Sequence, residues 1–167
     1  MRVAICIQEQ IYDALKDLLG NLRELPDYCK MQSFGFMDLN LDRLEQRNTT
    51  TTIAISHYYK HPSGDMIADP DMEIRIFHEL KMAEALSFQD IFGYKRVYHE
   101  NGYIDAETKT MLNKFLLQWL RNLKAQGFKR PVCRQAGKLK RLVAHDYKSG
   151  LYDGIIGVCA YFNNELI

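Results

Sequence analysis

The sequence lacks closely spaced cysteines and has no long apolar run. Its four cysteines lie far apart, and no two of them form the C-x-x-C pair that a zinc site or a redox site uses. The short apolar stretch near the amino terminus ends at Gln8, before the hydrophobic region of a signal peptide or a spanning helix is complete. These absences predict a cytoplasmic protein with reduced thiols and no membrane span.

Familiar catalytic motifs are also absent. The chain contains no glycine-rich phosphate loop, no G-x-S-x-G elbow and no H-E-x-x-H sequence. At 167 residues, with 47% hydrophobic and 26% charged residues, it has the length and composition of one globular domain. We therefore expect a single domain over residues 1–167 and favour a non-enzymatic function over a catalytic one.

The net charge of +1 conceals a strong asymmetry. Residues 121–148 carry nine basic residues and one acid, a net +8, whereas the other 139 residues carry 13 basic and 20 acidic residues, a net −7. Such a segment would neutralise nucleic-acid phosphates or bind an acidic protein, and the residues predicted for this contact are Lys129, Arg130, Arg134, Lys138, Lys140 and Arg141. Nearby, Phe128, Tyr147 and Tyr152 would stack on the bases of a single strand. The alternative is that the segment docks on the acidic remainder of its own chain.

Apolar periodicity divides the rest of the chain into helices and strands. Residues 8–25 have apolar side chains at spacings of three and four, which predicts a helix that ends at Pro26. From residue 34 the period changes to two, which predicts a hairpin of strands over 34–46 and 50–59. Prolines and a glycine predict a loop over 61–70, and strands follow over 72–77, 82–88 and 94–98.

The strongest helical pattern begins after Asp105, which is a good N-cap, and ends before Gly127. One broad face of this helix carries seven large apolar residues, Met111, Leu112, Phe115, Leu116, Trp119, Leu120 and Leu123. A final buried strand is expected within 152–162. Because no helix-length insert separates successive strands, the sequence predicts an α+β fold. In it, an antiparallel meander of about five strands packs against the long helix, with an amino-terminal helix and an additional carboxy-terminal strand.

Several short motifs occur in a recognisable order between residues 34 and 128. They are Pro70–His78, Ala83–Glu84, Ile91–Phe92, Lys95, Tyr98, Asn113–Arg121 and Gly127. In this order and spacing they resemble the YqiB-like family of small bacterial proteins, and a related group carried on plasmids and other mobile elements is similar at His57–Tyr59, Gly64–Met66 and Asp69–Met72. The resemblance implies a shared meander-plus-helix fold and a bacterial or mobile-element origin. Since that family has no known function, it supplies no catalytic residues. Residues 1–30 form a helical extension and residues 129–167 a basic extension beyond this core.

The loop between two predicted strands has the most suggestive chemistry. It brings His57, His61, Asp65, Asp69 and Asp71 into fifteen residues, and such carboxylates and imidazoles would hold a divalent cation. A metal there would activate water for phosphodiester hydrolysis. The alternative to a metal site is a turn. Asp-Pro-Asp is typical of turns, because Asp side chains accept hydrogen bonds from nearby backbone N–H groups. No other cofactor is predicted.

Two functional hypotheses follow from the sequence. The first is an accessory or regulatory module of a bacterium or mobile element that binds a protein or nucleic acid through its sheet surface or basic segment, with an anti-defence role by analogy. The second is a metal-dependent phosphodiester hydrolase that uses the acidic loop at 65–71. On neighbouring strands, Arg75, Glu84 and Glu73 are expected to pair across the sheet at exposed positions, as structure and not as catalysis.

Overall fold

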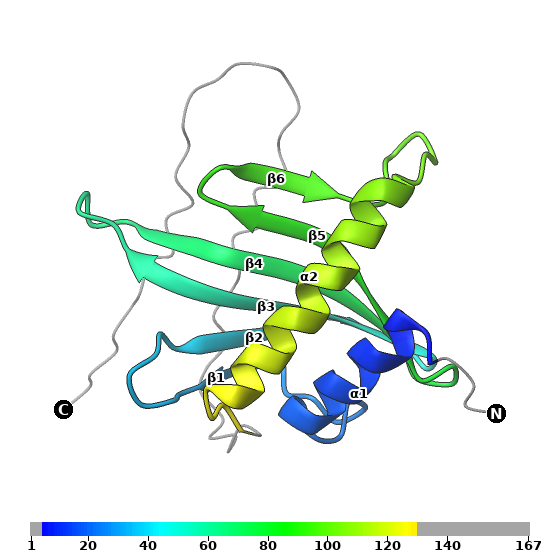
Figure 1. Ribbon diagram of the computed structural model, residues 1–167, viewed down its shortest axis with the longest axis horizontal. Coiled ribbons are helices and arrows are strands. Elements are labelled where there is room, and N and C mark those ends of the chain that lie inside the picture. Colours follow the sequence, from blue (N-terminus) through cyan, green and yellow to red (C-terminus); the bar gives the residue numbers. More distant parts are fainter. Residues whose placement is uncertain (1–4, 130–167) are drawn as a thin grey trace.

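The computed structural model describes residues 5–129 of the 167-residue chain. These residues form one antiparallel sheet with two helices on the same face (Figure 1). In chain order the elements are α1 (Ile7–Leu19), β1 (Tyr28–Met31), β2 (Leu39–Gln46), β3 (Thr50–Lys60), β4 (Met66–Phe77), β5 (Met82–Asp90), β6 (Gly93–Arg96) and α2 (Ala106–Ala125). The strand predicted within 152–162 lies outside the described residues.

The sheet is a meander of six strands, in which each strand pairs antiparallel with the next along the chain. This confirms the predicted α+β class and the meander. The sequence pattern missed β1, since a strand of four residues with only Cys29 and Met31 buried is too short to show a period. β2 begins at Leu39, so residues 34–38 belong to the β1–β2 connection and not to the strand predicted there.

The predicted loop over 61–70 is wrong in its second half. β3 runs to Lys60 and β4 starts at Met66, so the connection is residues 61–65 alone. Ser56 pairs with Asp71 and Tyr58 with Ala68, so the ladder is irregular around Pro70. A proline is tolerated at such an irregularity, because its missing N–H removes no ladder hydrogen bond.

α1 is shorter than predicted. Its C-cap, Gly20, has a φ of +82°, a conformation that glycine adopts without strain, and its N–H donates to the Lys16 carbonyl at 2.8 Å. Leu22 and Leu25 are nevertheless buried. The apolar spacing over 8–25 therefore predicted burial correctly and placed the helix end too late.

α2 starts where the sequence placed it. The Asp105 carboxylate accepts a hydrogen bond from the Thr108 backbone N–H at 2.9 Å, and this bond lowers the pKa of Asp105. The predicted seven-residue buried face is wrong at Met111 and Phe115, each of which is 41% exposed. Because α1 packs along one flank of α2, the buried arc turns toward α1 and takes in Leu117.

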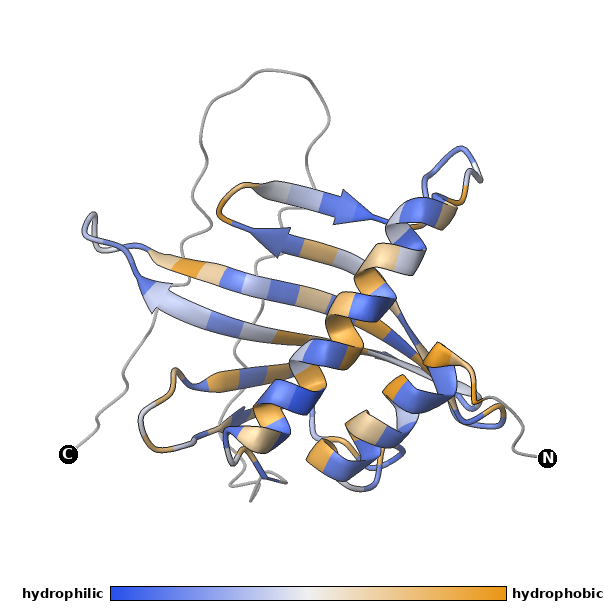
Figure 2. Cartoon of the chain, in the orientation of Figure 1, coloured by the Kyte–Doolittle hydropathy of each residue, from blue (hydrophilic) through white to orange (hydrophobic). Residues whose placement is uncertain are grey.

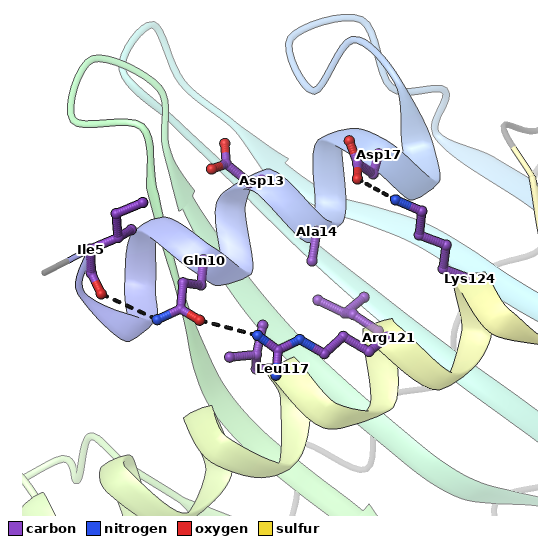
Figure 3. Close-up of a pocket in the computed structure, with 9 residues that line it drawn as sticks. Ile5, Gln10, Asp13, Ala14, Asp17, Leu117, Arg121 and Lys124 are labelled. Carbon is purple, nitrogen blue, oxygen red and sulfur yellow. Dashed lines mark hydrogen bonds and ion pairs between the residues drawn. The ribbon is translucent and has the colours of Figure 1, made fainter. Parts of the chain in front are cut away.

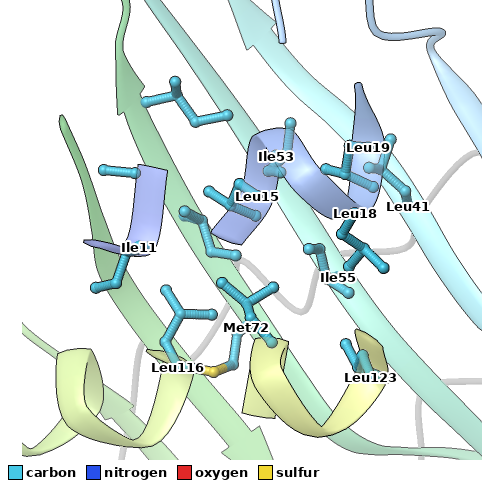
Figure 4. Packing of buried hydrophobic residues seen from close by; sticks show 14 of the residues in the cluster. Ile11, Leu15, Leu18, Leu19, Leu41, Ile53, Ile55, Met72, Leu116 and Leu123 are labelled. Atoms are coloured by element: carbon cyan, nitrogen blue, oxygen red, sulfur yellow. The ribbon is translucent and has the colours of Figure 1, made fainter. Parts of the chain in front are cut away.

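The core lies between the helices and one face of the sheet (Figure 4). On the sheet side it is built from cross-strand rows of apolar residues, in which Leu41 pairs with Ile55 and Ile55 with Met72. From the helices, Ile11 and Leu15 of α1 and Leu116 and Leu123 of α2 close over these rows.

Neither α1 nor α2 covers the other face of the sheet, which we call the open face (Figure 1). It is polar, and its central residues Ala54 and Ser56 are nevertheless buried. Hydrophobic and hydrophilic residues alternate along β4, so the two faces differ in character (Figure 2). Two rows of residues cross the open face in register: Tyr28, Asp42, Ala54, Glu73, Ser87 and Arg96 in one, and Lys30, Asn40, Ser56, Asp71, Gln89 and Tyr94 in the other. Within residues 5–129, no helix is long and apolar enough to cross a membrane.

Candidate interaction surfaces

The sheet separates two of the residues predicted to bind metal. His57 lies on the helix side, where its ring is 5.7 Å from the Trp119 ring and 6.0 Å from that of Phe128, and its Nδ1 is 3.0 Å from the Asp38 carbonyl oxygen. Asp71 pairs with Ser56 across the ladder and lies on the open face. A single ion cannot reach both side chains through the sheet.

The other three predicted ligands are spread along the hairpin. His61 and Asp65 lie in the turn, and both contact Ser63. The Ser63 Oγ is 2.9 Å from His61 Nδ1 and donates to the Asp65 carboxylate at 2.7 Å. Asp69 belongs to β4 beside the irregular stretch of the ladder. Residues 5–129 contain no group of three His, Cys, Asp or Glu side chains that would hold a metal ion. The metal-dependent hydrolase therefore stays a prediction, and residues 5–129 do not supply a cluster of side chains that would bind its metal.

Glu84 is the centre of a buried polar cluster. It is 5% exposed, not exposed as predicted, and both of its carboxylate oxygens accept from the Tyr98 hydroxyl at 3.0 Å. Lys109 Nζ, from α2, lies 2.5 Å from the same carboxylate, and Arg75 lies 3.9 Å away on β4. Arg75 is directly opposite Glu84 in the ladder, so this predicted pairing is confirmed.

The cluster has a structural role. Burial alone would lower the pKa of Lys109, but its hydrogen bonds to Glu84 and Tyr98 outweigh that effect and raise the pKa. A charged Lys109 thus joins the first turns of α2 to β5. Both carboxylate oxygens of Glu84 are engaged, so the cluster links β5 to the start of α2.

Large apolar side chains are exposed at one end of the sheet, which we call the apolar end. In the meander, the connections β1–β2, β3–β4 and β5–β6 all lie at this end (Figure 1). Two of these three connections are apolar. The exposed residues are Phe34, Phe36 and Met37 in the first and Ile91 and Phe92 in the third, beside the exposed Tyr94 at the start of β6. The turn between them is polar, with exposed His61 and half-buried Asp65.

Aromatic contacts run from the apolar end along α2. The rings of Phe36 and Phe128 lie 6.4 Å apart, and Phe128 also contacts the His57 ring. His57 contacts Trp119, whose ring lies 6.2 Å from that of Phe115. Sequence reasoning missed this surface. Ile91 and Phe92 could have indicated it, because large apolar residues are unusual in a two-residue turn.

A shallow groove of about 280 Å³ lies between the two helices (Figure 3). Its α1 side carries Asp13 and Asp17, and its α2 side carries Arg121 and Lys124. Two contacts already cross it, an ion pair of 2.6 Å between Lys124 and Asp17 and a hydrogen bond of 3.1 Å from Arg121 to Gln10. These contacts hold the helices together, and we assign the groove no ligand.

The predicted nucleic-acid or acidic-partner site falls almost entirely outside the described residues. Lys129 is described and exposed. The remaining five residues, Arg130, Arg134, Lys138, Lys140 and Arg141, lie beyond it in the chain. The binding role of this segment stays a prediction.

Comparison with known proteins identifies relatives but no activity. Over 86 residues the chain is 37% identical to the uncharacterized protein YqiB of Escherichia coli K12. The aligned residues make up 50% of this chain and 60% of that protein. YqiB of Escherichia coli O157:H7 matches with the same identity and coverage, so the chain spans 60% of the length of these relatives. No solved structure matches. These bacterial relatives confirm the YqiB-like resemblance. Residues 10–129 match the model of the family DUF6908, a domain of unknown function, and since this is more than half of the chain, the protein belongs to that family.

Proposed function

We propose that this protein is a non-enzymatic binding module that holds a protein partner at the apolar end of its sheet. One observation carries the proposal: two loops at the same end of the sheet each expose large apolar side chains to solvent. Phe34 is 103% exposed and Phe92 is 89% exposed. Exposed apolar groups that gather in this way are typical of protein interfaces, where aromatic residues and methionine are enriched.

The spacing of the two loops fits one protein interface. They lie near opposite edges of a six-stranded sheet, with their centres four strand spacings, about 19 Å, apart. A standard interface buries about 800 Å² on each partner, which corresponds to a patch about 30 Å across. One partner would therefore contact both loops, with the polar β3–β4 turn between its two apolar contacts.

Affinity purification from the native host, followed by binding measurements with each purified candidate, tests this proposal. We expect Phe92→Ala and Phe34→Ala each to weaken binding of the true partner about 5- to 30-fold, as loss of an interface anchor does. Neither substitution is expected to change the melting temperature, because both side chains are exposed.

Leu80→Ala is the matched control. Leu80 is also a large exposed apolar residue, at 63%, but it lies in the β4–β5 connection at the opposite end of the sheet. A partner whose affinity falls equally with Leu80→Ala, or does not fall with Phe34→Ala and Phe92→Ala, would contradict the proposal. The accessory role on a mobile element, including anti-defence, stays a prediction that the identity of the partner would test.

A further inference from the structure

The hairpin of β3 and β4 projects beyond the β5–β6 turn (Figure 1). β5 ends at Asp90, and its pairing with β4 stops where Gln89 faces Asp71. Residues 66–68 of β4 pair with β3 on one side, and within residues 5–129 no strand pairs with them on the other. We call residues 66–68 the free edge.

The backbone groups of Met66 and Ala68 point out of the free edge. In an antiparallel ladder, successive residues of a strand direct their N–H and C=O groups alternately to the neighbour on one side and to the neighbour on the other. The His61 N–H donates to the Asp65 carbonyl at 2.8 Å, so Asp65 and, two residues later, Ile67 face β3. Met66 and Ala68 therefore present their N–H and C=O groups to any strand added beside β4.

The free edge adjoins one loop of the apolar end. A strand added beside it would lie in line with β5, on the far side of the β5–β6 turn. This turn carries Ile91 and Phe92, which are 50% and 89% exposed. The added strand would therefore combine backbone hydrogen bonds to β4 with an apolar contact to the turn.

Charge decides which strand fits the free edge. Asp65 and Asp69 flank it and Asp90 ends β5, whereas Lys60 is the one lysine or arginine between residues 57 and 70. A second copy of this chain does not fit. Pairing of two free edges about Ile67 would set Asp65 of each copy opposite Asp69 of the other, and like charges directly opposite each other destabilise a sheet. A strand with Lys or Arg near these carboxylates is favoured instead.

We propose that the free edge binds an extended segment of the protein partner, which adds a strand beside β4 and carries Lys or Arg between apolar residues. The evidence is the outward backbone groups of the free edge, next to exposed apolar side chains and to carboxylates. This inference rests on the proposed function, because the partner that contacts the apolar end supplies the segment. It adds how the partner is recognised and the chemistry of the segment.

Peptide selection tests the inference before the partner is known. Short randomised peptides are selected in parallel on the full-length wild type and on Met66→Pro, in which proline removes an outward N–H and leaves the bonds to β3 intact. We expect enrichment on the wild type alone, of peptides in which Lys or Arg alternates with apolar residues. In fluorescence anisotropy, each labelled peptide should bind Met66→Pro at least about 10-fold more weakly than the wild type. Equal enrichment on the two proteins would overturn the inference.

Lys60→Pro is the matched control. Lys60 faces Met66 in the ladder, so its N–H points to the opposite edge of the hairpin and its loss should leave peptide binding unchanged. Equal weakening by both substitutions would show that binding does not depend on the free edge. Circular dichroism checks that both variants are folded. A second readout leaves the protein unaltered: methylation of alternate backbone nitrogens of the peptide should abolish binding, and binding that survives in both methylation patterns would overturn strand addition.

The native partner, once purified, separates this inference from the proposed function. Binding that weakens with Phe34→Ala and Phe92→Ala but not with Met66→Pro would leave the apolar end as the interface and overturn strand addition. Binding that weakens with Met66→Pro alone would support strand addition and contradict the proposed role of the two loops.

Discussion

At the scale of single residues, His78 links the fold to pH. It is 5% exposed, with Nε2 2.8 Å from the Thr51 hydroxyl. Burial lowers the pKa of His78, and the Arg23 cation lowers it further, while Glu79 opposes them. The folded protein therefore takes up this proton less readily than the unfolded chain. The folded state is therefore favoured by neutral His78. This contribution to the free energy of unfolding is fully present above the pKa of the unfolded histidine, about 6.5, and is lost as the pH falls below that value.

We predict that the melting temperature of the wild type falls more steeply between pH 7 and pH 5 than that of His78→Gln. The glutamine amide keeps a hydrogen-bonding group near Thr51 but cannot take up a proton in this range. Differential scanning calorimetry across that interval measures both slopes. The other histidines are common to the two proteins, so parallel curves would mean that His78 contributes nothing to the pH dependence.

The candidate sites show how far residue-level prediction extends. The pairing of Arg75 with Glu84 could be predicted, because residues at matching positions on adjacent predicted strands face each other. The burial of Glu84 could not, because it depends on Lys109 and Tyr98 from elsewhere in the chain. Similarly, proximity in sequence placed His57 near Asp71, whereas the ladder register puts them on opposite faces.

At the scale of elements, periodicity predicted what is long and regular. α2 and the strands over 50–59, 72–77 and 82–88 were predicted from periods of 3.6 and 2, which repeat several times in each. β1 was not predicted because it is only four residues long. The end of α1 was predicted too late because the buried Leu22 and Leu25 continue its apolar spacing beyond Gly20. The orientation of α2 about its axis depends on contact with α1, which a single helical pattern does not contain.

The orientation of α2 leads to a stability prediction. Leu116→Ala should lower the free energy of unfolding by about 3 kcal/mol, because Leu116 is 0% exposed and its loss leaves a cavity. Phe115→Ala should lower it by only about 1 kcal/mol, since Phe115 is 41% exposed, although its ring packs edge-on against Phe88 of the sheet. Urea unfolding measures both, with the exposed Gln118→Ala as the neutral control. A loss with Phe115→Ala as large as with Leu116→Ala would mean that the helix presents Phe115 to the core.

At the scale of the whole molecule, charge and apolar surface divide the chain into distinct regions. Six of the exposed large apolar side chains gather at the apolar end, and carboxylates lie near the centre of the open face. The net +8 segment begins within α2 at Arg121 and continues past the described residues. In the sequence, the predicted phosphate contact is therefore separate from the two loops of the apolar end.

The charge of the basic segment leads to a prediction about phosphate binding. Replacing Lys138 and Lys140 together by Gln should weaken binding of a labelled single-stranded oligonucleotide at 0.05 M salt, since two predicted phosphate contacts are lost. For every variant, the affinity should fall linearly with the logarithm of salt concentration, as counterion release requires. Fluorescence anisotropy measures both effects, and Glu107→Gln should match the wild type. Binding that ignores salt, or that the double substitution leaves unchanged, would contradict phosphate recognition by the basic segment.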